Sequence, residues 1–244
     1  MAFLTFPARV SRSELVTPSV LRLAFRRLDG ESLLFKPGQF VNIHFETAEG
    51  PTHRSYSIAN PPGDVNFEIA VSPVEGGRAT RILFDLKPGD NIQVSGPYGR
   101  FVLRDDPPCR YILVGTGTGI TPFRAMLPQL RERLAAGQAR VEILVGVRSR
   151  DEFLFAEDFE QAAREHPGIR LHACYSRQMP KEPERWETPG YVQDLFPQLG
   201  LDPEQDIVYL CGNPNMVDAA SAWLKQRDFP IKRIRREKYL SANA

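Results

Sequence analysis

Cysteine is scarce in this chain, and the three residues present, Cys109, Cys174 and Cys211, are far apart. Because they are scattered and odd in number, they give no disulfide framework and fit a reducing cytoplasm. They also exclude a zinc site built from cysteines and an internal plant-type iron–sulfur cluster, which needs four closely spaced thiolates. Since His44, His166 and His172 share no metal-ligand spacing either, we expect no metal.

The chain also lacks a long apolar run and an excess of charge. No apolar run reaches the roughly 18 residues that a membrane-spanning helix needs, and residues 1–10 do not have the pattern of a signal peptide. The net charge of +1 argues against a general nucleic-acid binder. With 244 residues, of which 42% are hydrophobic, we expect one large or two small cytoplasmic domains with no membrane or nucleic-acid partner.

The first half of the chain consists of short alternating runs separated by turn residues. One helix interrupts them, over 78–86, directly after Gly76-Gly77. Several short strands at this spacing are typical of a sandwich or barrel. The predicted strands are 8–16, 20–26, 39–45, 54–58, 66–71 and 91–94.

The pattern of hydrophobic residues changes after a predicted linker at 105–108. Apolar strands now alternate with helices, which indicates a parallel sheet covered on both faces. In such a sheet, ligands bind beyond the carboxyl ends of the strands. The predicted strands are 111–114, 141–147, 170–175 and 207–211, and the predicted helices are 120–136, about 155–165 and 215–225. We therefore expect two domains, 1–104 and 105–244.

Two glycine-rich turns could bind phosphate. The first, 115–122, follows an apolar strand and opens a helix, so glycines allow close backbone approach and the helix offers free N–H groups. Pro122 suits the first helical turn. The spacing differs from the G-x-G-x-x-G fingerprint, and a tight turn that binds nothing is the alternative. The second candidate, 76–80, likewise has glycines directly before a helix, the one predicted in the first half of the chain.

The segment Arg54-Ser55-Tyr56-Ser57 adds the decisive motif, R-x-Y-S. Together with the two glycine turns it resembles the ferredoxin–NADP reductase family, which includes the reductases of multicomponent oxygenases. The resemblance covers residues 39–239 approximately. It implies an N-terminal antiparallel β-barrel domain that binds FAD and a C-terminal α/β parallel-sheet domain that binds NAD(P).

The resemblance also implies roles for the residues of the first half. In the family the motif arginine, here Arg54, pairs with FAD phosphate, Tyr56 packs on the flavin and Ser57 faces flavin N5. Gly77-Arg78-Ala79-Thr80 resembles the G-x-x-S/T turn that holds the FAD pyrophosphate, and Gly96–Phe101 resembles the G-P-x-G-x-F hinge. The candidate FAD-binding residues are Arg54, Tyr56, Ser57, Ile58, Val71, Gly76, Gly77, Ala79, Thr80 and Tyr239.

The second half carries the nicotinamide motifs of the family. Residues 211–216 resemble C-G-x-P-x-M, in which Cys211 lies against the nicotinamide ring. Glu237-Lys238-Tyr239 resembles the terminal E-x-Y of plant-type members, but Leu240–Ala244 continue beyond it here. The candidate nicotinamide-binding residues are Gly117, Thr118, Thr121, Gly212, Pro214 and Met216, and the candidate catalytic residues are Ser57, Cys211, Glu237 and Tyr239.

Coenzyme preference depends on a second group of residues. Members that select NADP place Ser-Arg after a strand and a tyrosine later, and Ser176-Arg177 and Tyr191 match this pattern. Arg148 and Arg150 end the preceding strand at the same sheet edge. Because charged hydrogen bonds to a 2′-phosphate are strong, we expect NADP to be preferred over NAD.

The resemblance further implies a monomeric enzyme that passes single electrons to ferredoxin or flavodoxin. The alternatives are the reductase component of an oxygenase, a reductase of free flavin, and a nucleotide-sensing adaptor subunit without turnover. The segment 232–238 is basic. It is either a solvated edge strand or a docking face for an acidic electron carrier, since opposite charge steers encounter.

Overall fold

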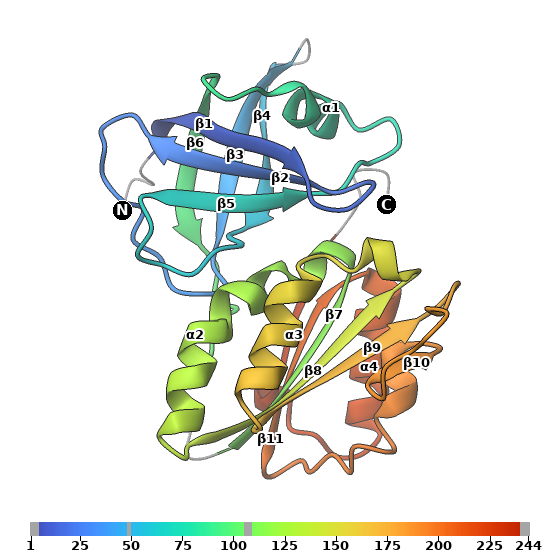
Figure 1. Cartoon of the computed structure of the whole chain (residues 1–244). Coiled ribbons are helices and arrows are strands. Elements are labelled where there is room, and N and C mark those ends of the chain that lie inside the picture. Colours follow the sequence, from blue (N-terminus) through green and yellow to red (C-terminus); the bar gives the residue numbers. More distant parts are fainter. Residues whose placement is uncertain (1–4, 48–49, 105–108, 240–244) are drawn as a thin grey trace. The chain divides into compact units, whose positions relative to one another are not determined.

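The computed structural model describes residues 5–47, 50–104 and 109–239 (Figure 1). The predicted linker at 105–108 lies outside the described residues. Contacts divide the chain into two units. The first runs to Leu103 and also includes Thr121–Met126, whereas the second comprises Arg104–Ile120 and the chain from Leu127 onward.

The first unit is a six-stranded antiparallel sheet in the order β4-β3-β6-β1-β2-β5. The two outer strands meet where Ile58 and Ile69 form a bridge and where the Ala59 N–H donates to the Glu68 carbonyl at 2.7 Å. The sheet therefore closes on itself, which confirms the predicted barrel. Its elements are β1 (Thr5–Leu15), β2 (Leu21–Arg27), β3 (Phe40–Thr47), β4 (Gly50–Ser57), β5 (Asn66–Val71), α1 (Arg78–Asp85) and β6 (Asn91–Tyr98).

Apolar side chains at alternate positions of the strands point into the barrel and fill its interior. In β1, Phe6, Ala8 and Val10 are buried and the residues between them are exposed. Val41 and Ile43 of β3 are fully buried on the same principle, since successive side chains point to opposite faces. The predicted strand at 91–94 was too short, because β6 continues through Gly96 and Pro97 to Tyr98, which pairs with Phe40 of β3.

The second unit is a six-stranded parallel sheet in the order β10-β9-β8-β7-β11-β12. Figure 1 shows α3 in front of this sheet and α4 behind it, as predicted for a sheet covered on both faces. Its strands are β7 (Cys109–Thr116), β8 (Ala139–Val147), β9 (Ile169–Tyr175), β10 (Glu187–Pro189), β11 (Asp206–Gly212) and β12 (Ile234–Lys238). Its α-helices are α3 (Ala156–Glu165) and α4 (Pro214–Lys225), and α2 (Thr121–Ala135) spans residues of both units.

Short 3₁₀ turns connect several of these elements: η1 (Gly117–Ile120), η2 (Arg150–Glu152), η3 (Val192–Leu195) and η4 (Ile231–Arg233). Strand β10 was not predicted, because it has only three residues and ends in a proline. Strand β12 is the outer strand of the sheet, so the basic segment does lie at an edge, as both interpretations of it require. Within the described ranges, every helix is too short or too polar to cross a lipid bilayer.

Candidate functional site

The direction in which strands are added to the sheet of the second unit reverses at β7. From β7 the chain adds β8 and β9 on one side, and it later adds β11 and β12 on the other. In open parallel sheets, such a reversal leaves a ligand-binding crevice at the carboxyl ends of the two central strands. Here those ends are Thr116 of β7 and Gly212 of β11, and Cys211 lies opposite Gly115. The glycine turn and the C-G-x-P-x-M motif are therefore neighbours.

Two glycines allow these strand ends to touch through their backbones. A Cβ on Gly119 would lie 2.3 Å from the Cys211 carbonyl oxygen. Gly212 has a φ of +119°, and a Cβ there would lie 2.5 Å from the Thr116 carbonyl oxygen. The Asn213 N–H donates to the Thr116 hydroxyl oxygen at 3.0 Å across the same gap. Only glycine has room at positions 119 and 212.

Helices begin directly after both strand ends. Helix α2 opens at Thr121 with a proline in its first turn, as predicted. Helix α4 opens at Pro214, and the Asn213 side chain accepts from the Asn215 N–H at 2.8 Å. The first N–H groups of a helix have no acceptor within the helix and attract anions. The buried Thr121 hydroxyl oxygen also has no hydrogen-bond partner in the described part of the chain.

Cys211 is fully buried at the end of β11. Burial and, to a smaller extent, the charge of Glu237 hold its pKa well above the usual value, and a hydrogen bond with Tyr239 opposes the shift. The register places Glu237 opposite Cys211, and the Tyr239 N–H donates to the Gly212 carbonyl at 2.9 Å. The structure thus brings three of the four predicted catalytic residues together. The thiol stays protonated at neutral pH, so it is not a nucleophile.

The candidate coenzyme-selecting residues lie further along the same sheet edge. Backbone N–H groups of Ser176 and Gln178 donate to the carbonyls of Val147 and Arg148, both at 2.9 Å. These bonds bring the chain at Arg177 next to the chain at Arg148. Both arginines are exposed. Among the described residues, no acceptor or carboxylate binds either guanidinium group, so their charge is available to a ligand.

Arg150 has a different environment. Its guanidinium group pairs with Glu160 and, at 3.1 Å, with the buried Glu187. It also lies over the ring of Trp186, 5.5 Å from the centroid. Because its charge is compensated within the protein, Arg150 is less suited than Arg148 to binding a phosphate.

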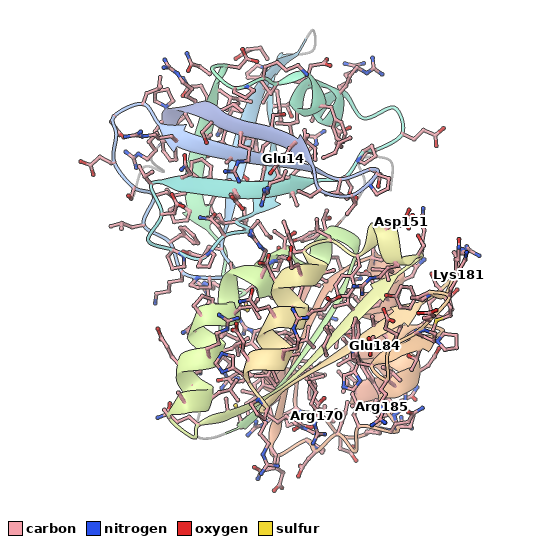
Figure 2. The ribbon with its side chains drawn as sticks, in the orientation of Figure 1. Glu14, Asp151, Arg170, Lys181, Glu184 and Arg185 are labelled. Carbon is pink, nitrogen blue, oxygen red and sulfur yellow. The ribbon has the colours of Figure 1, made fainter. Side chains whose placement is uncertain are left out.

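Tyr191 precedes η3 and leaves 57% of its surface exposed. Its N–H donates to the Asp194 carboxylate at 2.9 Å, which fixes the backbone below the ring. The segment between β9 and β10 is largely solvated, and Figure 2 shows Lys181 at its outer margin, directed away from the sheet. The Gly190 N–H donates to the Tyr175 carbonyl at 3.0 Å, so Tyr191 follows at the same edge of the sheet as the two arginines. An exposed aromatic ring and uncompensated arginines suit a ligand with a flat ring and a phosphate.

The motif of the first unit lies on β4. Arg54 and Tyr56 share one face of the strand, since side chains alternate, and they lie opposite Ile43 and Val41 of β3. Arg54 donates only to neutral oxygens, those of Thr52 at 3.2 Å and the His53 carbonyl at 2.8 Å. No carboxylate pairs with it in the described part of the chain. Its positive charge is therefore suited to a phosphate.

Tyr56 is half-buried against the barrel core. Burial raises the pKa of its phenol to about 12, against a smaller opposing effect of Arg54, so the phenol is neutral. Ser57 is buried at the end of the strand. The side chains of Ile58 and Val71 are fully buried in the barrel, so a cofactor contact at these two positions would involve their backbone.

The turn before α1 lines a pocket of about 180 Å³. Gly77 is the N-cap of this helix, and Gly76 has a φ of +69° with open space around it. A Cβ on Gly77 would lie 2.9 Å from the Val74 carbonyl oxygen. The Thr80 hydroxyl donates to the Gly77 carbonyl at 3.0 Å. Arg81 lines the same pocket and adds a positive charge that the motif did not predict.

Comparison with known proteins places both units in one family. The model of the oxidoreductase FAD-binding domain matches residues 7–103, and that of the oxidoreductase NAD-binding domain matches residues 113–222. The chain is 35% identical to ferredoxin–NADP reductase B of Sorangium cellulosum, over 96% of this chain and 97% of that one. The chain belongs to the ferredoxin–NADP reductase family.

Other members of the family are oxygenase reductases. The chain is 30% identical to the reductase component of propane 2-monooxygenase from Rhodococcus jostii, over 96% of this chain and 63% of that one. It is 31% identical to the Amycolatopsis cytochrome P450 reductase GcoB, with a TM-score of 0.83 over 97% of this chain and 70% of that one. A ferredoxin NADP+ reductase from Neisseria gonorrhoeae shares the fold, with a TM-score of 0.82 at 20% identity over 96% and 98% of the two chains.

Family membership identifies the chain as an NAD(P)H-dependent flavin oxidoreductase that binds FAD and a nicotinamide dinucleotide. It shares the family's use of a redox protein as electron acceptor. The local observations fit the flavin: an uncompensated Arg54, the half-buried Tyr56 ring and the glycine turn before α1. Sequence analysis missed Asn213 and Arg81. A cap residue directly before Pro214 was the available signal for Asn213, and no signal identified Arg81.

The contact between Gly119 and the Cys211 carbonyl can be tested by adding one methyl group. We predict that Gly119→Ala destabilises the protein by about 3 kcal/mol or more, because the obstructing atoms belong to the backbone and cannot rotate away. The free energy of unfolding from chemical denaturation measures the change.

The matched control is Gly117→Ala. Gly117 has a φ of +55° but open space around its Cα, so this variant carries the cost of a left-handed conformation, about 1 kcal/mol, without a clash. If the two variants lose equal stability, close approach of β7 and β11 is not the reason for the glycine at 119.

Proposed function

We propose that the protein is an FAD-containing NADPH reductase that supplies electrons singly to a ferredoxin or flavodoxin. The observation that carries the proposal is the meeting of the ends of β7 and β11, where a neutral, buried Cys211 lies beside Glu237. The 35% identity to a ferredoxin–NADP reductase over nearly the whole of both chains supports this choice of acceptor.

Residues of the first unit would hold FAD. The α1 turn at Gly76, Gly77, Ala79 and Thr80 offers helix N–H groups to its pyrophosphate, and Arg54 offers a guanidinium fork to a phosphate. The neutral ring of Tyr56 provides a flat apolar surface for the flavin. When bound, FAD would accept a hydride from NADPH and release the two electrons one at a time.

Residues of the second unit would hold and orient NADPH. Gly117, Thr118 and Thr121, with Gly212, Pro214 and Met216, form or flank the ends of β7 and β11 and the helix starts that follow. Cys211 would contact the nicotinamide ring, since a protonated thiol is small and apolar. Glu237, Tyr239 and Ser57 complete the proposed catalytic set, and Ser57 would face the reacting atom of the flavin.

We also propose that NADP is preferred over NAD. Ser176, Arg177, Arg148 and Tyr191 are the residues we assign to this preference. The support is geometric, because two exposed and uncompensated arginines lie on adjacent segments. One charged hydrogen bond to the 2′-phosphate contributes about 1.5–3 kcal/mol, which corresponds to roughly 10- to 150-fold in affinity.

The coenzyme proposal predicts a selective loss. Arg177→Ala and Arg148→Ala should each lower kcat/KM for NADPH about tenfold or more, while kcat/KM for NADH stays within twofold. Arg185→Ala is the matched control, because Arg185 is an exposed arginine on the same segment (Figure 2). Equal losses with both coenzymes, or similar losses in the control, would show that the two arginines do not recognise the 2′-phosphate.

For the acceptor, we propose docking on the basic edge formed by Lys232 and β12. Arg236 and Lys232 are exposed, and Lys238 pairs with Asp218 at 2.7 Å. Positive charge on an edge strand also prevents edge-to-edge association. The alternative is therefore that these basic residues only keep the edge strand solvated and bind no electron carrier. We further assign the protein to the cytoplasm as a monomer, from the scattered cysteines and the family resemblance.

Cytochrome c reduction with NADPH tests the acceptor. We expect the rate to depend on an added acidic ferredoxin or flavodoxin and to fall as ionic strength rises. Arg236→Glu should lower this rate several-fold without changing ferricyanide reduction, and Lys181→Glu, a charge reversal at an exposed site elsewhere, should lower neither.

The outcomes separate the alternatives. A rate that requires free flavin rather than a carrier protein indicates a free-flavin reductase. Oxygenase components that accept electrons when ferredoxin and flavodoxin do not indicate an oxygenase reductase, a role that the longer relatives carry. A protein that binds NADPH but reduces neither ferricyanide nor a carrier is an adaptor, and the proposal fails.

A further inference from the structure

Two histidines that are distant in sequence meet on the outer wall of the barrel. His44 of β3 and His53 of β4 are directly paired across the strands. Their ring centroids lie 5.6 Å apart with an angle of 42° between the ring planes. Sequence spacing alone did not connect them, because eight residues and the turn between β3 and β4 separate them. Neither belongs to the proposed flavin or nicotinamide sites.

The separation of the rings matches a shared metal ion. Two imidazoles bound to one Zn²⁺ through bonds of about 2.0–2.1 Å have centroids about 5–6 Å apart. Both rings lie on the outward-facing side of the two strands, where His53 is exposed and His44 is half-buried.

His44 is already oriented by a neighbour. Its Nε2 is hydrogen-bonded to the Ser95 hydroxyl oxygen of β6 at 2.7 Å, which leaves Nδ1 as the free ligand atom. Metal-binding histidines commonly use one ring nitrogen for the metal and the other for such a bond.

We propose that His44 and His53 form a binding site for a divalent transition-metal ion, with Zn²⁺ as the representative ligand. Imidazole favours zinc, copper and nickel over the hard cations magnesium and calcium. In the part of the chain that the structure describes, no group of three or more histidines, cysteines and carboxylates could hold a metal. The ion therefore keeps water in its other positions and binds more weakly than in a closed structural site.

An ion at this site would cross-link β3 and β4. His53 directly precedes Arg54, but successive residues of a strand point to opposite faces, so the ion lies on the side away from Arg54 and Tyr56. The consequence is stabilisation of the strand pair that carries the R-x-Y-S motif, without a contact to the cofactor. Because a ligand that binds only the folded state stabilises it, Zn²⁺ should raise the thermal midpoint.

The test is a Zn²⁺ titration of the FAD-loaded protein by calorimetry after removal of metals with a chelator. We expect one ion per chain. His44→Gln and His53→Gln should each weaken Zn²⁺ binding at least tenfold. The double variant should have about the same Zn²⁺ affinity as the single variant that binds less tightly, with no further loss. Co²⁺ gives a second readout, because its visible absorption changes when nitrogen ligands are lost.

His166→Gln, which removes a histidine of the second unit, is the matched control and should bind Zn²⁺ as the wild type does. Zn²⁺ should raise the midpoint of thermal unfolding of the wild type and of this control, but not of the His44 or His53 variants. FAD content confirms that each variant is folded. The proposal is overturned if the wild type shows no saturable binding at submillimolar Zn²⁺, or if folded His44→Gln and His53→Gln bind with wild-type affinity.

Discussion

Backbone contact between the ends of β7 and β11 is the constraint on which the site of the second unit depends. A parallel sheet that is extended in both directions from β7 brings these ends together, but only glycines at 119 and 212 let them touch. That contact lies directly before the starts of α2 and α4. The pairing of β11 with β12 then places Glu237 opposite the buried Cys211.

The barrel of the first unit obeys a comparable constraint. Closure between Ile58 and Ile69 determines where β4 ends, and Ser57 is the last residue of that strand. The buried side chains of Ile58 and Val71 serve this closure and the core. Arg54 and Tyr56 lie on β4 itself, which pairs with β3 along its whole length. The side chains that close the barrel are therefore not the side chains proposed to contact FAD.

Sequence analysis predicted the two architectures because their periodicities differ, with alternation in the barrel strands and continuous apolar runs in the parallel sheet. It also identified the glycine turn and the C-G-x-P-x-M motif, which are local patterns and which the fold places next to each other. It did not predict β10, which is too short to have a periodicity, and it grouped Arg150 with Arg148. The pairing of Arg150 with Glu160 and Glu187 depends on residues distant in sequence. The His44–His53 pair was missed for the same reason, because strand register creates it.

Direct transfer of a hydride from NADPH to FAD bound by this chain is the central claim. The most direct measurement is anaerobic rapid mixing of the FAD-loaded protein with NADPH, and with NADPH deuterated at the transferred position, while flavin absorbance is recorded. The account predicts uptake of one FAD per chain, bleaching in the first turnover and a slower rate with the deuterated coenzyme. A chain that takes up no FAD, or a bound flavin that stays oxidised with both NADPH and NADH, would contradict it.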